Sequence, residues 1–256
     1  MLTRTIIKFA AKLPKIDSFN TYLFVGPHPD DIEIGAGASV AKLIKLNKEV
    51  HFLICTDGRF GNGHLLDKTY DEVAAIRKQE SIASAKFLGL KEENIHFLDL
   101  SDGGFYEYDE LVNGIARIVG DINPDIIFAP DPLSKSECHK DHLNVGNAAK
   151  QIACFAPYPG IMENYGAKKA DVKAIAFYMS ANCNTYFKTS GYFDTQIKSV
   201  TDFHKSQFID NEFDSIKLYL KLRSIEYGLK CFALSGEGFR VLGTTHMHCL
   251  PESGGK

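Results

Sequence analysis

A short apolar run that ends in two prolines is the feature that most constrains how this chain can fold. Residues 22–25 (Tyr-Leu-Phe-Val) are typical of a buried β-strand, and Pro27 and Pro29 prevent that strand from continuing. From Gly35 to Leu46 the apolar residues recur at helical spacing. The segment therefore predicts a strand, a tight loop and a helix, in that order. In an open α/β sheet, ligands bind at such loops, which lie at the carboxyl ends of the strands.

This loop carries three side chains that are suited to metal chemistry, namely His28, Asp30 and Asp31. An imidazole and one carboxylate can bind the same ion, and the second carboxylate is then free to act as a base. Zn²⁺ favours such mixed nitrogen and oxygen ligands, and a catalytic site keeps one coordination position open for water. Alternatively, one aspartate only caps the helix and the histidine is an ordinary loop residue. The loop alone leaves both interpretations open.

A second polar cluster follows another predicted strand. Residues 126–129 form a short apolar run, and the polar loop after it ends in His139, Asp141 and His142, where a further helix is expected to begin. Two histidines three residues apart on a helical turn can face the same side. Two His/Asp clusters, each after a buried strand, favour one shared metal site over two unrelated loops.

The rest of the chain continues to alternate between strands and helices. Further strands are predicted at residues 50–56, 94–98, 125–129 and 172–178, and helices at residues 70–88 and 111–119. The alternation predicts an α/β fold: a Rossmann-like three-layer sandwich with a mostly parallel sheet, helices on both faces and the active site at the strand ends.

A single domain over residues 1–256 is the simplest organisation, because no linker or internal repeat divides the chain. We expect a core at about residues 20–180 and a C-terminal helical elaboration at about residues 195–256. Within the second half, residues 155–170 are expected to be irregular, and residues 201–230 to be mostly helical with a break near Asp210.

Charge and composition exclude several classes of partner. A net charge of −3 and a pI near 6.3 provide no basic surface for nucleic acid. No apolar run approaches the ~18–20 residues of a membrane span. Residues 1–15 are mildly basic and amphipathic, and a short surface helix is predicted there rather than a signal peptide. The scattered cysteines indicate free thiols and a cytoplasmic protein. A homo-oligomer is compatible with the sequence, which does not decide the point.

The paired motifs His28-Pro29-Asp30-Asp31 and His139-Lys140-Asp141-His142 resemble those of the LmbE/PIG-L family of zinc-dependent N-acetylsugar deacetylases. Four further segments resemble that family's pattern in the same order: Gly35-Ala36-Gly37, Thr56-Asp57-Gly58, Arg77 with Glu80, and Glu237-Gly238-Phe239-Arg240. The likeness covers about residues 20 to 150 well and the remainder thinly.

The resemblance implies a ligand set and a base. His28, Asp31 and His142 are expected to hold Zn²⁺, and Asp30 beside them is expected to act as general base on the zinc-bound water. Other divalent transition metals, such as Fe²⁺, Co²⁺ or Mn²⁺, suit the same His and Asp ligands.

The resemblance also implies roles for three further residues. His139 is expected to protonate the leaving amine or stabilise the oxyanion, and Asp141 to orient His139 and raise its pKa. Arg77 is expected to contact the substrate. The alternative for Arg77 is an exposed helix charge paired with Glu80.

The predicted function is therefore a metal-dependent hydrolase that removes the N-acetyl group from a small amino sugar or glycoconjugate. Two alternatives remain: a catalytically silent sugar-binding protein that retains the metal site, and a zinc amidase that acts on a non-sugar amide. Asp30 and His139 favour the enzyme, because metal binding alone does not require either of them.

Overall fold

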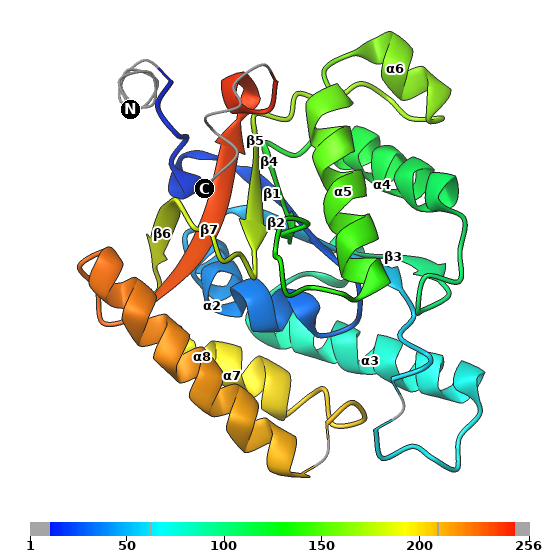
Figure 1. Ribbon diagram of the computed structural model, residues 1–256, viewed down its shortest axis with the longest axis vertical. Helices are drawn as coiled ribbons and strands as arrows, with labels where there is room; N and C mark the ends of the chain where they lie inside the picture. Colours follow the sequence, from blue (N-terminus) through cyan, green and yellow to red (C-terminus); the bar gives the residue numbers. More distant parts are fainter. Residues whose placement is uncertain (1–10, 62, 209, 249–256) are drawn as a thin grey trace.

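A seven-stranded β-sheet organises the described part of the chain, and helices cover both of its faces (Figure 1). The structure is a computed structural model that describes residues 11–61, 63–208 and 210–248, without the side chains of residues 210 and 211. The strands are β1 (Thr21–Gly26), β2 (Glu49–Thr56), β3 (Ile95–Leu100), β4 (Ile126–Pro130), β5 (Ala174–Tyr178), β6 (Thr185–Lys188) and β7 (Gly236–Gly243). Their order across the sheet is β3-β2-β1-β4-β5-β7-β6.

The first five strands are parallel, and β7 runs antiparallel to both of its neighbours, β5 and β6. Tyr22 in β1 pairs with Val50 of β2 on one side and with Ile126 of β4 on the other. The chain builds outward from β1 to β2 and β3, and then returns to place β4 and β5 on the opposite side. The order therefore reverses at β1 and β4, and open α/β sheets bind their ligands at the carboxyl ends of the strands at such a reversal.

The helices form two outer layers. They are α2 (Asp31–Lys45), α3 (Tyr70–Leu88), α4 (Tyr108–Ile122), α5 (Lys140–Phe155), α6 (Pro159–Asn164), α7 (Phe193–Thr201) and α8 (Asp210–Lys230), with short 3₁₀ turns η1 (Ile16–Ser18), η2 (Glu92–Asn94) and η3 (Thr244–His246). Leu23 and Val25 of β1 pack toward α4 and α5, whereas Tyr22 and Phe24 pack toward α2. All four side chains are fully buried, as expected for a parallel strand covered on both faces.

The predicted α/β class with a mostly parallel sheet is confirmed. Helix α3 has the predicted bounds because both of its ends carry strong local signals. Thr69 accepts a hydrogen bond from the backbone of Glu72 in a capping box, and Gly89 ends the helix at a φ of 104°.

Other boundaries differ from the prediction. Helix α2 begins at Asp31, four residues before Gly35, and α6 lies within a segment that was expected to be irregular. Residues 202–208 are not helical, and α8 begins at Asp210. For the predicted N-terminal helix, residues 1–10 lie outside the described part, and residues 11–15 are not helical.

Strand β7 was not predicted, because its three glycines are typical of a loop. The structure gives two of them a packing role. A Cβ at Gly236 or Gly238 would lie 2.9 Å from atoms of Tyr227, so both glycines let α8 pack directly against the strand. One sheet thus includes the C-terminal segment, and the assignment of residues 1–256 to a single domain stays a prediction.

Candidate metal centre

The two His/Asp clusters meet at the carboxyl ends of β1 and β4. His28 and Asp30 lie in the loop after β1, and Asp31 is the first residue of α2. His139 caps the N-terminus of α5, and Asp141 and His142 lie in its first turn. Since β1 and β4 are neighbours in parallel register, the loops that follow them lie side by side.

The loop after β1 is held by several short contacts. The backbone N–H of His28 donates to Asp31 Oδ2 at 2.9 Å, and both the N–H and the hydroxyl of Thr56 donate to the Pro27 carbonyl at 2.8 Å. Asp30 adopts a φ of 119°, a conformation that costs free energy for any residue with a Cβ. Such strain concentrates at functional sites, where the surrounding structure maintains it.

Asp31 Oδ2 lies between two imidazoles. It is 3.0 Å from His28 Nδ1 and 3.4 Å from His142 Nε2, and one donor atom from each of the three residues lies within 4.8 Å of the others. Zinc bonds of about 2.0–2.2 Å in a tetrahedron place neighbouring ligand atoms about 3.3–3.6 Å apart. The separations of 3.0 and 3.4 Å are close to this spacing, so the three residues could hold one metal ion and leave a fourth tetrahedral position open.

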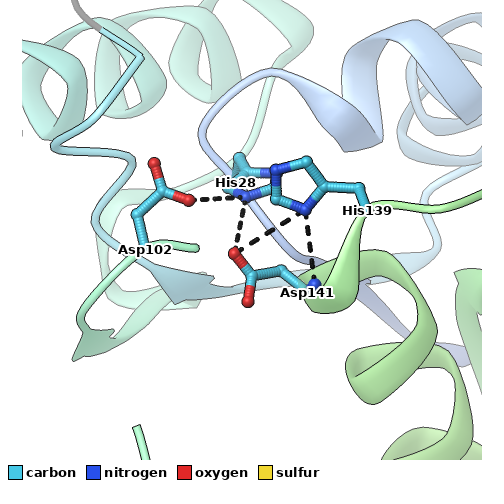
Figure 2. Close-up of side chains that lie close together, drawn as sticks. All are labelled: His28, Asp102, His139 and Asp141. Carbon is cyan, nitrogen blue, oxygen red and sulfur yellow. Dashed lines mark hydrogen bonds and ion pairs between the residues drawn. The ribbon is translucent and has the colours of Figure 1, made fainter. Parts of the chain in front are cut away.

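The other nitrogen of His28 faces two carboxylates that the ligand set does not use (Figure 2). His28 Nε2 lies 3.1 Å from Asp102 Oδ1 and 3.1 Å from Asp141 Oδ2. Burial lowers the pKa of His28, but the carboxylates of Asp102, Asp141 and Asp31 outweigh it and raise that pKa well above its ordinary value. A histidine that binds a metal through one nitrogen commonly donates its other N–H to a carboxylate, which fixes the ring.

Asp102 belongs to this centre although its position was not predicted as part of it. It follows β3, and the backbone N–H of Gly103 donates to its Oδ1 at 2.6 Å and to Asp141 Oδ2 at 2.8 Å. Burial raises the pKa of Asp102, but the hydrogen bond and charge of His28, together with the Gly103 N–H, outweigh it and lower that pKa. The sequence signal for Asp102 as a site residue was its place before two glycines, in the turn after a predicted strand. Together with His28, His139 and Asp141, Asp102 also forms a second group of potential metal ligands.

Asp30 lies deep in the centre beside Arg77, which emerges from α3. Asp30 is 4% exposed and Arg77 is 2% exposed. Arg77 Nη2 lies 3.4 Å from Asp30 Oδ2. Burial outweighs the attraction of Arg77 and raises the pKa of Asp30 to about 6. Asp30 is therefore ionised at neutral pH and becomes protonated as the pH falls through about 6.

Arg77 makes its other contacts with the protein backbone. Its guanidinium donates to the Gly58 carbonyl at 2.7 Å and to the Pro29 carbonyl at 3.0 Å. The alternative of an exposed charge paired with Glu80 is wrong, because Arg77 is buried and Glu80 accepts hydrogen bonds from Ser206. The predicted contact between Arg77 and a substrate stays a prediction.

His139 is the most accessible of the site histidines, with its side chain 48% exposed. Its Nδ1 accepts a hydrogen bond from the backbone N–H of Asp141 at 3.3 Å, so Nε2 carries the proton of the neutral ring. Asp141 Oδ2 lies 3.8 Å from His139 Nδ1 but only 3.1 Å from His28 Nε2. In the structure Asp141 is thus closer to His28, and its predicted role in orienting His139 stays a prediction.

Two further groups fix the loop that leads to α5. Glu137 Oε2 lies 3.2 Å from His142 Nδ1, an ion-pair distance without the alignment of a hydrogen bond. At the start of the same loop, Asp131 receives two hydrogen bonds from Arg240 of β7, at 2.5 and 2.9 Å, and one from the Ser180 hydroxyl at 2.5 Å. The buried Asp131–Arg240 pair ties the loop after β4 to β7.

Comparison with known proteins places this geometry in a family. The sequence pattern of the PIG-L family, described as GlcNAc-PI de-N-acetylase, matches residues 23–153, which include both His/Asp motifs. The chain belongs to the PIG-L family. The resemblance inferred from the two motifs is thereby confirmed.

Two relatives of this chain are named as deacetylases of N-acetylated sugars. The chain is 29% identical over 260 residues to the diacetylchitobiose deacetylase of Thermococcus kodakarensis, covering 95% of this chain and 94% of that protein. It is 25% identical over 158 residues to the 1D-myo-inositol 2-acetamido-2-deoxy-alpha-D-glucopyranoside deacetylase of Mycolicibacterium smegmatis, covering 53% of each.

Solved structures share the fold of this chain. The N,N'-diacetylchitobiose deacetylase of Pyrococcus horikoshii matches with a TM-score of 0.85 and 29% identity, over 98% of this chain and 93% of that one. GalB, a 4-carboxy-2-hydroxymuconate hydratase, matches with a TM-score of 0.73 at 14% identity, over 87% of this chain and 96% of that one. Because a hydratase has the same fold, the fold alone does not determine the reaction.

Proposed function

We propose that this PIG-L protein is a metal-dependent hydrolase that removes the N-acetyl group from a small amino sugar or glycoconjugate. The observation that carries the proposal is the arrangement around Asp31, whose Oδ2 lies 3.0 Å from His28 Nδ1 and 3.4 Å from His142 Nε2. A buried carboxylate, Asp30, lies next to this ligand set in sequence and is available as a base.

His28, Asp31 and His142 would hold the metal, with Zn²⁺ as the first choice and other divalent transition metals as alternatives. When bound, such an ion polarises an amide carbonyl and lowers the pKa of water toward neutrality. His28 needs a defined ring orientation for this purpose. The carboxylates of Asp102 and Asp141, each 3.1 Å from its Nε2, would provide that orientation.

Asp30 is the proposed general base. Its pKa of about 6 keeps the carboxylate ionised at neutral pH, yet basic enough to accept a proton from an attacking water. Arg77 would position this carboxylate, since the same guanidinium also hydrogen-bonds to the Pro29 carbonyl next to it. The strained backbone of Asp30 supports a functional role for the residue.

His139 is the proposed acid. Its ring lies edge-on to that of His28, with centroids 4.7 Å apart, and its half-exposed position lets it reach a bound substrate. Since Nδ1 accepts from the Asp141 backbone, the proton on Nε2 is the one available to the leaving amine or to the developing oxyanion.

Two alternatives lead to different results in one assay. A silent sugar-binding protein would bind N-acetylated sugars without hydrolysing them, and a general amidase would also cleave acetamides that carry no sugar. We expect the Zn²⁺-supplemented protein to release acetate from N-acetylglucosamine or N,N'-diacetylchitobiose and not from N-methylacetamide. Absence of acetate from both sugars, under conditions where the protein holds its metal, would contradict the proposed function.

The predicted partner is a small N-acetylated sugar or glycoconjugate, in keeping with the named substrates of the relatives. No helix among the described residues has the length and apolar character needed to cross a membrane. Cytoplasmic location and a homo-oligomeric state stay predictions.

A further inference from the structure

Two histidines from neighbouring strands face each other near the amino ends of β2 and β3. His51 Nδ1 lies 3.3 Å from His96 Nε2, and the planes of the two rings differ by 19°. The strand register brings these residues together across 45 positions of sequence, because His96 pairs with Leu53, two residues along β2 from His51. Side chains alternate across a sheet, so these three residues share one face.

The pair lies well away from the candidate metal centre. That centre is at the carboxyl ends of the strands, where Thr56, the last residue of β2, hydrogen-bonds to the loop after β1. His51 comes five residues earlier on β2, and five residues of strand span about 16 Å. β3 is the edge strand, His96 is half-buried, and the side chain of Glu49 beside His51 is 59% exposed. Ions in solution therefore have their own access to the pair.

The protonation state of the pair suits metal binding. Burial lowers the pKa of His51 although the Glu49 carboxylate raises it, and burial and the neighbouring His51 lower the pKa of His96. Both rings are therefore neutral at neutral pH, which is the form in which histidine binds a metal. Each neutral ring has one nitrogen with a free lone pair.

Glu49 determines which nitrogen of His51 carries that lone pair. Its Oε1 lies 3.3 Å from His51 Nε2. A proton on Nε2 that faces this carboxylate leaves the lone pair on Nδ1, the atom next to His96. Carboxylates orient metal-binding histidines in the same way. The 3.3 Å between the facing nitrogens of His51 and His96 also matches the spacing of about 3.3–3.6 Å between neighbouring ligands of a tetrahedral zinc ion.

We propose that His51 Nδ1 and His96 Nε2 form a second metal site, which binds a divalent transition metal such as Zn²⁺, Ni²⁺ or Cu²⁺. Glu49 would orient His51, and water would fill the remaining coordination positions. Imidazole nitrogens suit these ions, whereas Mg²⁺ and Ca²⁺ favour oxygen ligands. Because it has fewer protein ligands than the candidate metal centre, this site would release its ion when free metal is removed. It does not depend on the proposed function, since the two sites share no residue.

Calorimetric titration with Zn²⁺ tests the site in protein that has first been loaded with zinc and separated from free metal. We expect wild type to bind about one further zinc ion per chain at micromolar free Zn²⁺. His51→Gln and His96→Gln should each lose this binding, because one imidazole alone remains. Glu49→Gln should weaken it by about 10- to 100-fold. His64→Ala is the control, at an exposed histidine outside the pair, and should bind as wild type does.

Thermal melting gives a second readout and checks the folding of each variant. An ion that binds only the folded state stabilises it by mass action. Zn²⁺ added to the zinc-loaded protein should therefore raise Tm for wild type and His64→Ala, but not for His51→Gln or His96→Gln. The same concentration of Mg²⁺ should leave Tm unchanged. A variant that melts cooperatively without added metal is folded, so its loss of binding reports on the site.

The variant His142→Ala distinguishes the two metal sites. It should lose zinc from the candidate metal centre and keep the weaker binding at His51 and His96. Absence of a further zinc ion in wild type, or a further ion that both His51→Gln and His96→Gln retain, would refute the second site. Neither result changes the release of acetate, which tests the proposed function separately.

Discussion

Replacing Asp102 tests whether the carboxylates beside His28 Nε2 strengthen metal binding by the same ring. The structure places two carboxylates, from Asp102 and Asp141, at the same distance of 3.1 Å from His28 Nε2. A neutral ring that binds a metal through Nδ1 has one N–H at Nε2, which one carboxylate accepts at a time. Loss of such an acceptor typically weakens metal affinity by about 10- to 100-fold.

The expected magnitude follows from this shared arrangement. Asp102→Asn leaves Asp141 in place to accept the N–H, so we expect a loss near the lower end, about tenfold in zinc affinity. Asp102→Asn combined with Asp141→Asn removes both carboxylates, and we expect zinc affinity to fall by about 100-fold or more. The combined loss should exceed the sum of the two single free-energy changes, because each carboxylate compensates for loss of the other.

Zinc affinity is measured by competition with a chromophoric chelator at fixed pH. Asp99→Asn is the matched control, since Asp99 lies near the end of β3, three residues before Asp102, is more than half exposed and pairs with Lys78 at the surface. The control should bind zinc as wild type does. An Asp102→Asn variant with affinity within about twofold of wild type, together with strictly additive changes in the double variant, would refute the reasoning.

Three further predictions concern single residues. Asp30→Asn should retain its metal in elemental analysis but lose about 10²–10⁴-fold in kcat, and near-normal turnover would remove Asp30 from the role of base. Arg240→Met should lower the free energy of unfolding by about 3–5 kcal/mol, because it leaves Asp131 as a buried carboxylate without its counter-charge; a loss below about 1 kcal/mol in urea titration would contradict this. Glu237 accepts hydrogen bonds from Ser39, and burial raises its pKa from 4.5 to about 7. The folded state therefore holds the proton more strongly than the unfolded state, so stability should fall as pH rises from about 4.5 to 7, by roughly 1.4 kcal/mol per unit at most. Glu237→Gln should remove that slope, and an unchanged slope would contradict the assignment.

The sequence was most informative where local signals and burial agree. Strand β1 and helix α3 were predicted closely because a continuous apolar run marks the first, and a capping threonine and a terminating glycine mark the second. The two His/Asp motifs could be joined into one site because each follows a buried strand, and parallel strands bring their carboxyl ends to one edge of a sheet.

The elements that were missed depend on contacts between distant parts of the chain. Strand β7 contains three glycines, and only the close approach of α8 explains them. Asp102 lies in the turn after β3, which is two strands away from β1 in the sheet. Only the folded arrangement brings its carboxylate within 3.1 Å of His28 Nε2.

Zinc content tests the central claim most directly, because the account requires two distant loops to hold one ion. Wild type, His142→Ala and a control, His64→Ala, are stripped, reloaded with Zn²⁺, separated from free metal and analysed for bound zinc. His64 is an exposed histidine outside both clusters. The account predicts about one zinc ion per chain in wild type and control, and a large loss in His142→Ala. Undiminished zinc in His142→Ala would contradict it.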